Sequence, residues 1–281
     1  MNILIGGLGD LGRRCARLWS AAGHTVIGLK RRPQIDPGEG WQTLAADMAA
    51  LQPGQFDQVE LALFCASPDQ RSESAYQACY FEAAAAFMAS VPAAARRLLV
   101  SSSAPIEGAD GQWVDEDQHC PAERWNGKLL AAAERQLRRS WPALCVLMPS
   151  GLYGPGRNWL LRRVLAGETG GGRYTHRIHI DDCARAVVHL SAQTQRAPRY
   201  LLTDDAPLPE WQVMAGLAEM LGQTPARRGP VAEGRRLSNR RLHASGFRLH
   251  YPDFRRGYRD LLSSAGPVNR QQTTSTLSDA P

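Results

Sequence analysis

Short, uninterrupted apolar runs alternate with longer amphipathic or alanine-rich stretches along the first half of the chain. Apolar runs without polar alternation are typical of strands buried on both faces of a parallel sheet. Strands alternating with helices imply right-handed crossovers, so the pattern predicts an α/β fold with a doubly wound parallel sheet. We expect strands at residues 2–5, 25–29, 41–45, 59–65, 97–101 and 143–148, and helices after the first strand, at 72–90 and at 121–140.

The pattern changes beyond residue 150, where glycines and arginines become frequent. A strand is expected at 177–180, a helix from there to residue 192, a strand at 200–203, and helices at 210–221 and around 238–244. We therefore expect a first domain formed by residues 1–150 and 174–204 and a smaller C-terminal lobe formed by 151–173 and 205–262. Residues 263–281 lack aromatic side chains and are expected to be a disordered tail.

Glycines follow the first predicted strand at Gly6, Gly9 and Gly12, before a helical pattern begins. A strand, a glycine turn and a helix in this order bring backbone N–H groups and a helix N-terminus against a pyrophosphate, where a Cβ would hold the anion away. Gly7, Gly9 and Gly12 also fit the G-x-G-x-x-G pattern, so the sequence leaves open which glycine makes the first turn. The stretch predicts a dinucleotide site.

The end of the second predicted strand carries Lys30, Arg31 and Arg32, and the first acidic residue after it is Asp36. An NAD site usually has an acidic residue here for the ribose hydroxyls, whereas a 2′-phosphate needs cationic partners. These residues favour NADP as the cofactor. The alternative is a solvated basic surface.

Ligands in such a sheet gather beyond the carboxyl ends of the strands. Asp47 could meet an adenine edge there, although capping of the next turn is its commoner role. The residues expected to hold the cofactor lie at these ends: Gly6, Gly9, Asp10, Leu11, Gly12, Lys30, Arg31, Arg32, Asp47, Cys65, Ala66, Ser67, Ser101, Lys128, Pro149 and Gly151.

Composition narrows the class of protein. The chain has 281 residues, 43% of them hydrophobic and 21% charged, with no apolar run of the ~20 residues needed to span a bilayer and no secretory leader. We expect a cytoplasmic protein without a membrane partner. Its six cysteines show no metal or disulfide spacing and should be reduced.

The net charge is +6, and arginines are concentrated late in the chain. Such a cluster could hold an anionic substrate or form a solvated basic face. We expect no nucleic-acid partner because recognition motifs and interleaved aromatic residues are lacking.

Four segments together resemble the short-chain dehydrogenase/reductase superfamily, in its extended and atypical branch of NAD(P)-dependent epimerases and dehydratases. The resemblance covers almost the whole length and implies a Rossmann-type domain with a C-terminal lobe that closes over a small-molecule substrate. It also implies a possible homodimer, paired through the helices at 72–90 and 121–140. The segments are the three glycines, residues 100–104, residues 151–157 and residues 177–184.

The resemblance implies a Ser, a Tyr and a Lys as catalytic residues. Ser103 matches the Ser and Lys128 the Lys, but Arg124 occupies the Tyr position. A guanidinium does not release its proton near neutral pH, so Arg124 cannot act as a general acid or base. The usual proton carrier is therefore missing.

Three possibilities remain open for the chemistry. Another group could carry the proton, with Tyr153 as our catalytic candidate beside Tyr174, His176 and Glu107. Arg124 could instead clamp a carbonyl or carboxylate while water supplies the proton. Finally, the chain could be a catalytically silent, NADP-responsive regulator.

A metal site is not expected. His179 and the two aspartates that follow it could suggest ligands, but Asp181 lies at a predicted helix start, where N-capping is the usual role.

Overall fold

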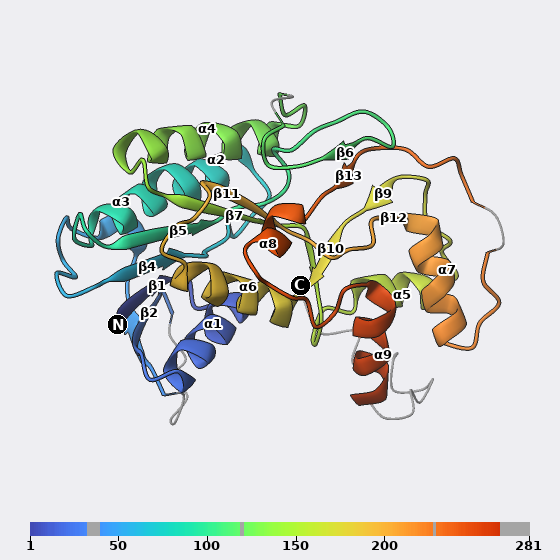
Figure 1. The fold of residues 1–281 in the computed structure, drawn as a ribbon, viewed down its shortest axis with the longest axis horizontal. Helices are drawn as coiled ribbons and strands as arrows, with labels where there is room; N and C mark the ends of the chain where they lie inside the picture. The colour runs from blue at the N-terminus through green and yellow to red at the C-terminus, as the bar shows by residue number, and fades with distance from the viewer. Residues whose placement is uncertain (33–39, 119–120, 227–228, 265–281) are drawn as a thin grey trace.

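A seven-stranded parallel sheet forms the centre of the protein in the computed structural model, which describes residues 1–32, 40–118, 121–226 and 229–264 (Figure 1). The strand order is β11-β7-β5-β4-β1-β2-β3, so the chain starts in the middle and winds outward in both directions. This is the doubly wound α/β fold that the sequence predicts. The strands are β1 (Asn2–Gly6), β2 (Thr25–Lys30), β3 (Gln42–Ala45), β4 (Leu61–Phe64), β5 (Arg96–Val100), β7 (Cys145–Pro149) and β11 (Arg199–Leu202).

Helices cover both faces of this sheet (Figure 1). Helices α1 (Asp10–Ala21) and α6 (Ile180–Ala192) pack together on one face. The other face carries α2 (Glu73–Gln77), the π-helical segment η2 (Ala78–Ala83), α3 (Ala84–Ala89) and α4 (Trp125–Ser140). Side chains of β1 alternate between the two cores: Ile3 and Ile5 join the first, and Leu4 the second. This explains why the three central residues of the strand, 3–5, are all apolar.

Two of the predicted helices differ in detail from the observed ones. The helix predicted at 72–90 is confirmed, with Ser72 as its N-cap, but a π-helical stretch lies in its middle. The helix predicted from residue 121 begins only at Trp125. A Cβ on Gly127 would lie 2.8 Å from the carbonyl oxygen of Ala104, so the first turn of α4 is packed directly on the segment that follows β5.

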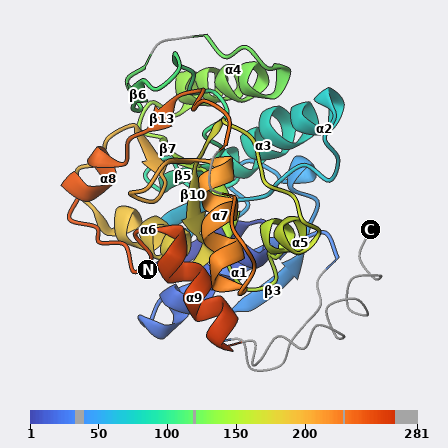
Figure 2. The same ribbon diagram turned by 90° about the vertical axis from the view of Figure 1, so that its right-hand side faces the viewer.

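Three helices form the core of the C-terminal lobe: α5 (Trp159–Leu165), α7 (Glu210–Met220) and α9 (Phe254–Ser264) (Figure 2). The sequence pattern did not predict α9, because arginines separate its apolar positions. Phe254, Tyr258 and Leu261 nevertheless lie at helical spacing and pack in the lobe core. Short strand pairs complete this side of the protein: β8 (Gly151–Tyr153) with β10 (Arg177–His179), β9 (Tyr174–Thr175) with β12 (Leu208–Pro209), and β6 (Trp113–Val114) with β13 (Arg236–Leu237).

The segment between β13 and α9 packs against the sheet side of the protein. Helix α8 (Arg240–Ala244) contacts β11, and Leu242 and Phe247 belong to the core that includes β1. This stretch, assigned to the lobe from sequence, thus contributes to the larger core. The predicted tail falls outside the described residues from position 265 onward.

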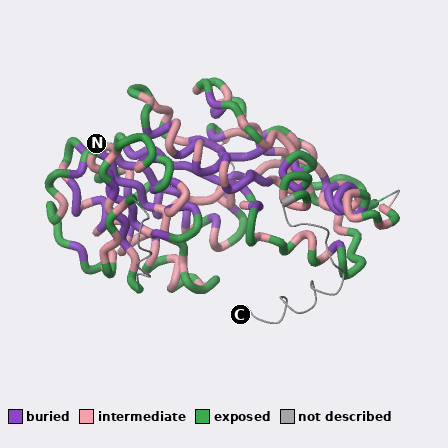
Figure 3. Tube along the Cα trace, turned by 90° about the horizontal axis from the view of Figure 1, so that it is seen from below, coloured by how far each residue is buried: buried purple, intermediate pink, exposed green. Residues whose placement is uncertain are grey.

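Buried residues run through the sheet, while exposed residues occupy the outer turns (Figure 3). Among the described helices, none is both long enough and apolar enough to cross a membrane.

Candidate functional site

Gly7 makes the first turn of the glycine segment. Its φ is +103°, a backbone conformation open to glycine, and its N–H donates to the carbonyl oxygen of Leu29 at 3.1 Å. A Cβ on Gly7 would lie 2.6 Å from the backbone nitrogen of Ala66. This settles the question that the sequence left open. Gly6 is the last residue of β1, where a Cβ would lie 2.8 Å from the Phe87 ring.

The two later glycines serve different purposes. Gly9 precedes α1 directly, and a Cβ on it would meet nothing within 4 Å. A Cβ on Gly12 would overlap the carbonyl oxygen of Gly7. Gly12 therefore lets helix and turn pack closely, while Gly9 leaves open space at the helix N-terminus. This geometry fits the pyrophosphate of a dinucleotide.

Asp10 lies in the first turn of α1 and links it to the lobe side. Its carboxylate accepts from Arg14 Nε at 2.8 Å and from Arg157 Nε at 3.2 Å. Arg14 also pairs with Asp181 at the start of α6. Two arginines thus balance the acidic side chain that stands beside the proposed anion position.

The basic end of β2 borders a cavity of about 350 Å³ lined by Lys30, Arg31, Arg32 and Asp69. Arg31 Nη2 donates to Asp69 Oδ1 at 2.6 Å. This hydrogen bond raises the pKa of Arg31 and lowers the pKa of Asp69. Arg31 at the end of β2 is therefore ion-paired with Asp69, which lies in the loop after β4. The sequence did not predict this partner.

The capping alternative for Asp47 is confirmed: its side chain accepts from the N–H of Ala49 at 3.1 Å.

The loop that follows β4 forms the wall opposite the glycine turn. Cys65 Sγ donates to the carbonyl oxygen of Gly7 at 3.1 Å, and burial raises the pKa of this thiol to about 12. Cys65 is therefore a neutral wall residue. All five cysteines in the described residues are free, and Cys120 lies outside them.

The strand ends beyond β5 and β7 lie side by side. Ser101 N–H donates to the carbonyl oxygen of Leu147, and Ser103 N–H to that of Pro149, at 2.8 and 3.1 Å. The expected cofactor positions at Ser101, Pro149 and Gly151 thus share one edge of the sheet with the glycine turn.

The structure brings Ser103, Arg124 and Lys128 to this same edge. The contact of Gly127 with Ala104 places the start of α4 on the segment that contains Ser103. Lys128 is exposed and lines a cavity of about 470 Å³ together with Pro105 and Ile106. Arg124 is exposed at the N-cap of α4.

Tyr76 is an additional phenol near this position. Its ring lies 5.0 Å from that of Trp125, the residue after Arg124. Sequence spacing could not have identified it, because α2 and α4 are brought together only by the fold.

Two of the proposed proton carriers are poorly suited to the task. The Tyr153 hydroxyl donates to the carbonyl oxygen of Asp253 at 3.4 Å, its ring stacks on Tyr258, and burial raises its pKa. Burial, with Arg235 and Arg177 nearby, lowers the pKa of His176 to about 3, so this imidazole is neutral near pH 7. The role of Tyr153 as a catalytic residue stays a prediction.

The remaining candidates have partners of their own. Glu107 pairs with Arg235 at 3.5 Å, and the ring of Tyr174 lies 5.3 Å below the guanidinium of Arg236.

His179 is the N-cap of α6, rather than Asp181 as expected. Its Nδ1 accepts from the N–H of Asp181 at 3.3 Å. The imidazole serves here because β10 continues directly into α6, which leaves Asp181 already inside the first turn.

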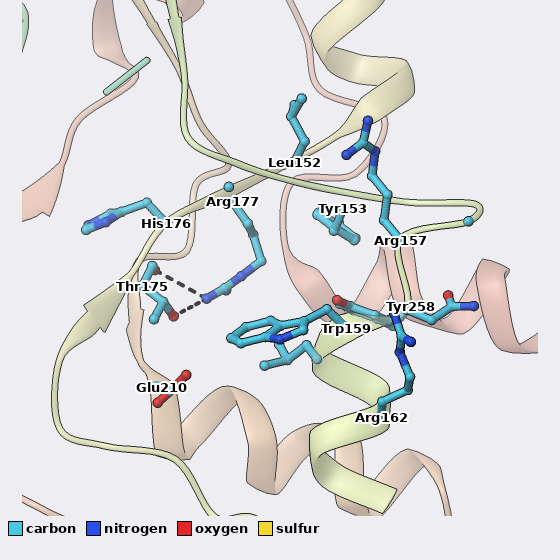
Figure 4. Close-up of a pocket in the computed structure, with 14 residues that line it drawn as sticks. Leu152, Tyr153, Arg157, Trp159, Arg162, Thr175, His176, Arg177, Glu210 and Tyr258 are labelled. Atoms are coloured by element: carbon cyan, nitrogen blue, oxygen red, sulfur yellow. Dashed lines mark hydrogen bonds between the residues drawn. The ribbon is translucent and has the colours of Figure 1, made fainter. Parts of the chain in front are cut away.

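A cavity of about 470 Å³ lies beside the carboxyl end of β7, between the sheet side and the lobe (Figure 4). Gly151 and Leu152 line it from the sheet side, and Trp159 and Tyr258 from the lobe. Its position next to the expected nicotinamide end of the cofactor makes it the candidate substrate cavity.

Comparison with known proteins agrees with this geometry, although no protein-family model matches the chain. A solved structure from Methylobacillus flagellatus, described as an NAD-dependent epimerase/dehydratase, is 33% identical and superposes with a TM-score of 0.80. The match covers 94% of this chain and 98% of that one. MoeE5 in complex with UDP-glucuronic acid and NAD is 22% identical with a TM-score of 0.75, over 92% of this chain and 96% of that one, and shows likeness of fold.

A curated relative from Streptomyces sp, 3-diazoavenalumate denitrifying reductase, is 34% identical over 161 residues. This match covers 52% of the chain and 53% of the relative, so the chain spans about half the length of the protein it matches.

The sheet order, the glycine turn and the cavity at the strand ends define a Rossmann-type dinucleotide-binding protein with a smaller C-terminal lobe. Taken with the match over nearly the whole of the Methylobacillus protein, they place the chain in the NAD-dependent epimerase/dehydratase family of the short-chain dehydrogenase/reductase superfamily.

Proposed function

We propose that the protein is an NADP-dependent reductase that acts on a small organic molecule in the cavity between β7 and the lobe. The observation that carries the proposal is the glycine turn, with open space at Gly9 and a basic strand end beside it. The N–H groups at the start of α1 would hold the pyrophosphate, and Arg31 with Lys30 would hold the 2′-phosphate. When bound there, a reduced nicotinamide would supply a hydride to the neighbouring cavity.

Reduction fits the residues better than epimerisation or dehydration. Reactions that begin by oxidising an alcohol need a base that removes the hydroxyl proton. Arg124 cannot do this, and the Tyr153 phenol is already engaged with Asp253. A hydride acceptor that needs no proton from a phenol avoids the difficulty.

The Streptomyces relative is named as a denitrifying reductase of a diazo compound, and reduction of a diazonium group by hydride is a reaction that needs no phenolic proton. When hydride replaces a diazonium group, the new C–H bond forms as the C–N bond breaks, and dinitrogen leaves with the bonding electrons. The nicotinamide is oxidised, and no proton is required. We infer that the substrate of this chain belongs to acceptors that need no phenolic acid, such as diazonium or iminium compounds.

Single-turnover mixing tests the proposal. Protein mixed with NADPH and a panel of arenediazonium, iminium and ketone compounds would be followed at the nicotinamide absorbance, with the Gly9→Ala variant as control. We expect consumption of NADPH with a diazonium or iminium compound and little with ketones. NADPH binding without turnover of any acceptor would favour the silent regulator, and failure to bind either nicotinamide cofactor would overturn the proposal.

A further inference from the structure

Four arginines from distant parts of the chain converge on one region between the Ser103 segment and the start of the lobe. Arg124 precedes α4, Arg173 precedes β9, Arg177 begins β10 and Arg235 precedes β13. We call these four residues the arginine cluster. Arg235 is central to it, since Nη2 donates to the carbonyl oxygen of Ser103 at 3.2 Å.

Two largely buried acidic groups accompany the arginine cluster: Glu107 beside Arg235, and Asp204 near Arg177, where burial raises the pKa of Asp204 to about 7. Arg235 has Glu107 as its ion-pair partner, at 3.5 Å, and both side chains are largely buried. The pKa of Arg235 is lowered by burial, and Arg173 and Arg124 lower it further against the effect of Glu107. The pKa of His176 is lowered by burial and then by Arg235, Arg177 and Arg173. The lowered pKa values of Arg235 and His176 therefore both indicate a positive electrostatic potential around the arginine cluster.

Unpartnered nitrogen atoms lie in the same region. Within the described ranges, Arg235 Nε, His176 Nε2 and Arg177 Nη1 are buried and have no hydrogen-bond partner. Arg177 is 5% exposed, and both it and His176 line the candidate substrate cavity (Figure 4). The two arginine nitrogens are always N–H donors, and buried donors without partners are costly, which makes this region suited to an acceptor supplied by a ligand.

We propose that the arginine cluster binds an oxyanion group, carboxylate or phosphate, carried by the substrate. Arg235 and Arg177 anchor this group at the inner side, and the exposed Arg124 approaches from the α4 side. The residue at the family's Tyr position then contributes to substrate binding, whereas its role in proton transfer is lost. The inference rests on the proposed function, because it identifies the class of substrate for the same cavity.

Ligand binding tests the proposal without turnover. Cinnamate, phenyl phosphate and the neutral cinnamamide would be titrated into full-length protein saturated with NADP⁺ and, separately, into cofactor-free protein. The readout is tryptophan fluorescence with a calorimetric check. The anion should bind about tenfold or more tightly than the amide, as expected for charge-assisted hydrogen bonds. Tighter binding of cinnamate would identify the oxyanion group as a carboxylate, and tighter binding of phenyl phosphate would identify it as a phosphate.

Arginine variants test where the anion binds. Arg235→Met and Arg124→Gln should each lower anion affinity, Arg235→Met by about tenfold or more, with cofactor affinity unchanged. Arg236→Met is the matched control, because Arg236 donates to the carbonyl oxygen of Gly111 outside the cluster. If Arg235→Met does not fold, Arg124→Gln still tests the proposal, because Arg124 is exposed and its replacement should not affect folding.

Equal affinity for anion and amide, no saturable anion binding, or unchanged anion affinity in both cluster variants would overturn the proposal. Failure of NADPH binding would overturn the proposed function instead, and anion binding to cofactor-free protein would still be measurable.

Discussion

Gly12 lies so close to Gly7 that a Cβ on Gly12 would overlap the Gly7 carbonyl oxygen, whereas a Cβ on Gly9 would meet nothing within 4 Å. Gly12 is therefore needed for the packing of α1 on the turn, whereas Gly9 leaves space for a ligand. This contrast gives the first prediction.

Gly12→Ala should force α1 away from the turn and destabilise the protein by about 1–3 kcal/mol, together with loss of cofactor binding. Gly9→Ala should leave the free energy of unfolding nearly unchanged, because its backbone is ordinary extended chain. It should nevertheless weaken NADPH binding at least about tenfold, since the methyl group occupies the phosphate position. Urea unfolding and fluorescence titration measure the two quantities; equal cofactor affinity in Gly9→Ala and wild type would refute the assigned phosphate position.

In the proposed NADPH complex, Asp69 would compete with the 2′-phosphate for Arg31. An exposed ion pair is worth little, so Asp69→Asn should raise NADPH affinity by a modest factor of about 3–10 and leave NADH affinity within about twofold. Arg31→Met should lower NADPH affinity, and Glu73→Gln, on exposed α2, is the control. A fall in NADH affinity in Asp69→Asn would instead show that Asp69 binds the ribose hydroxyls.

Asp204 is 1% exposed, and burial raises its pKa to about 7, against the opposing effect of Arg177. Because the folded-state pKa lies above the unfolded value, this group's contribution to stability is fully present below about pH 4 and is lost as the pH rises to about 7. The free energy of unfolding of Asp204→Asn, relative to wild type, should therefore increase by roughly 1–3 kcal/mol between pH 5 and pH 8.

Urea unfolding at both pH values measures this difference, and Asp57→Asn, at an exposed position, should show no such change. Comparing the pH dependence, instead of the absolute stability, removes the pH-independent cost of replacing the buried carboxyl group by an amide. A flat difference would contradict the raised pKa.

Asp182, on α6, binds the segment before α9 through hydrogen bonds. Its fully buried carboxylate accepts from the N–H groups of His250 and Tyr251 at 3.0 and 2.7 Å and pairs with Arg185. Asp182→Ala should cost about 3 kcal/mol, since it leaves buried donors without an acceptor. Asp181→Ala, which removes a half-exposed partner of Arg14, should cost less than about 1 kcal/mol. Similar losses of unfolding free energy in the two variants would contradict this role of Asp182.

Local pattern was sufficient for the fold class and for the glycine turn between β1 and α1. A strand buried on both faces must be apolar at every position, and a glycine turn needs glycine wherever backbone atoms approach, so both requirements are visible along a few consecutive residues. The basic end of β2 was visible for the same reason. The boundaries of α4 and the presence of α9 were not, because packing against distant segments decides them.

Tertiary structure alone decided which distant side chains meet. Asp69 reaches Arg31 across 38 residues, and Arg235 reaches Ser103 across 132. Neither pair has a signature in sequence spacing, since each depends on crossovers that return the chain to the same edge of the sheet. The amino-acid sequence thus determined where a dinucleotide could be held, and the packing of the lobe against the sheet determined which charges surround the neighbouring cavity.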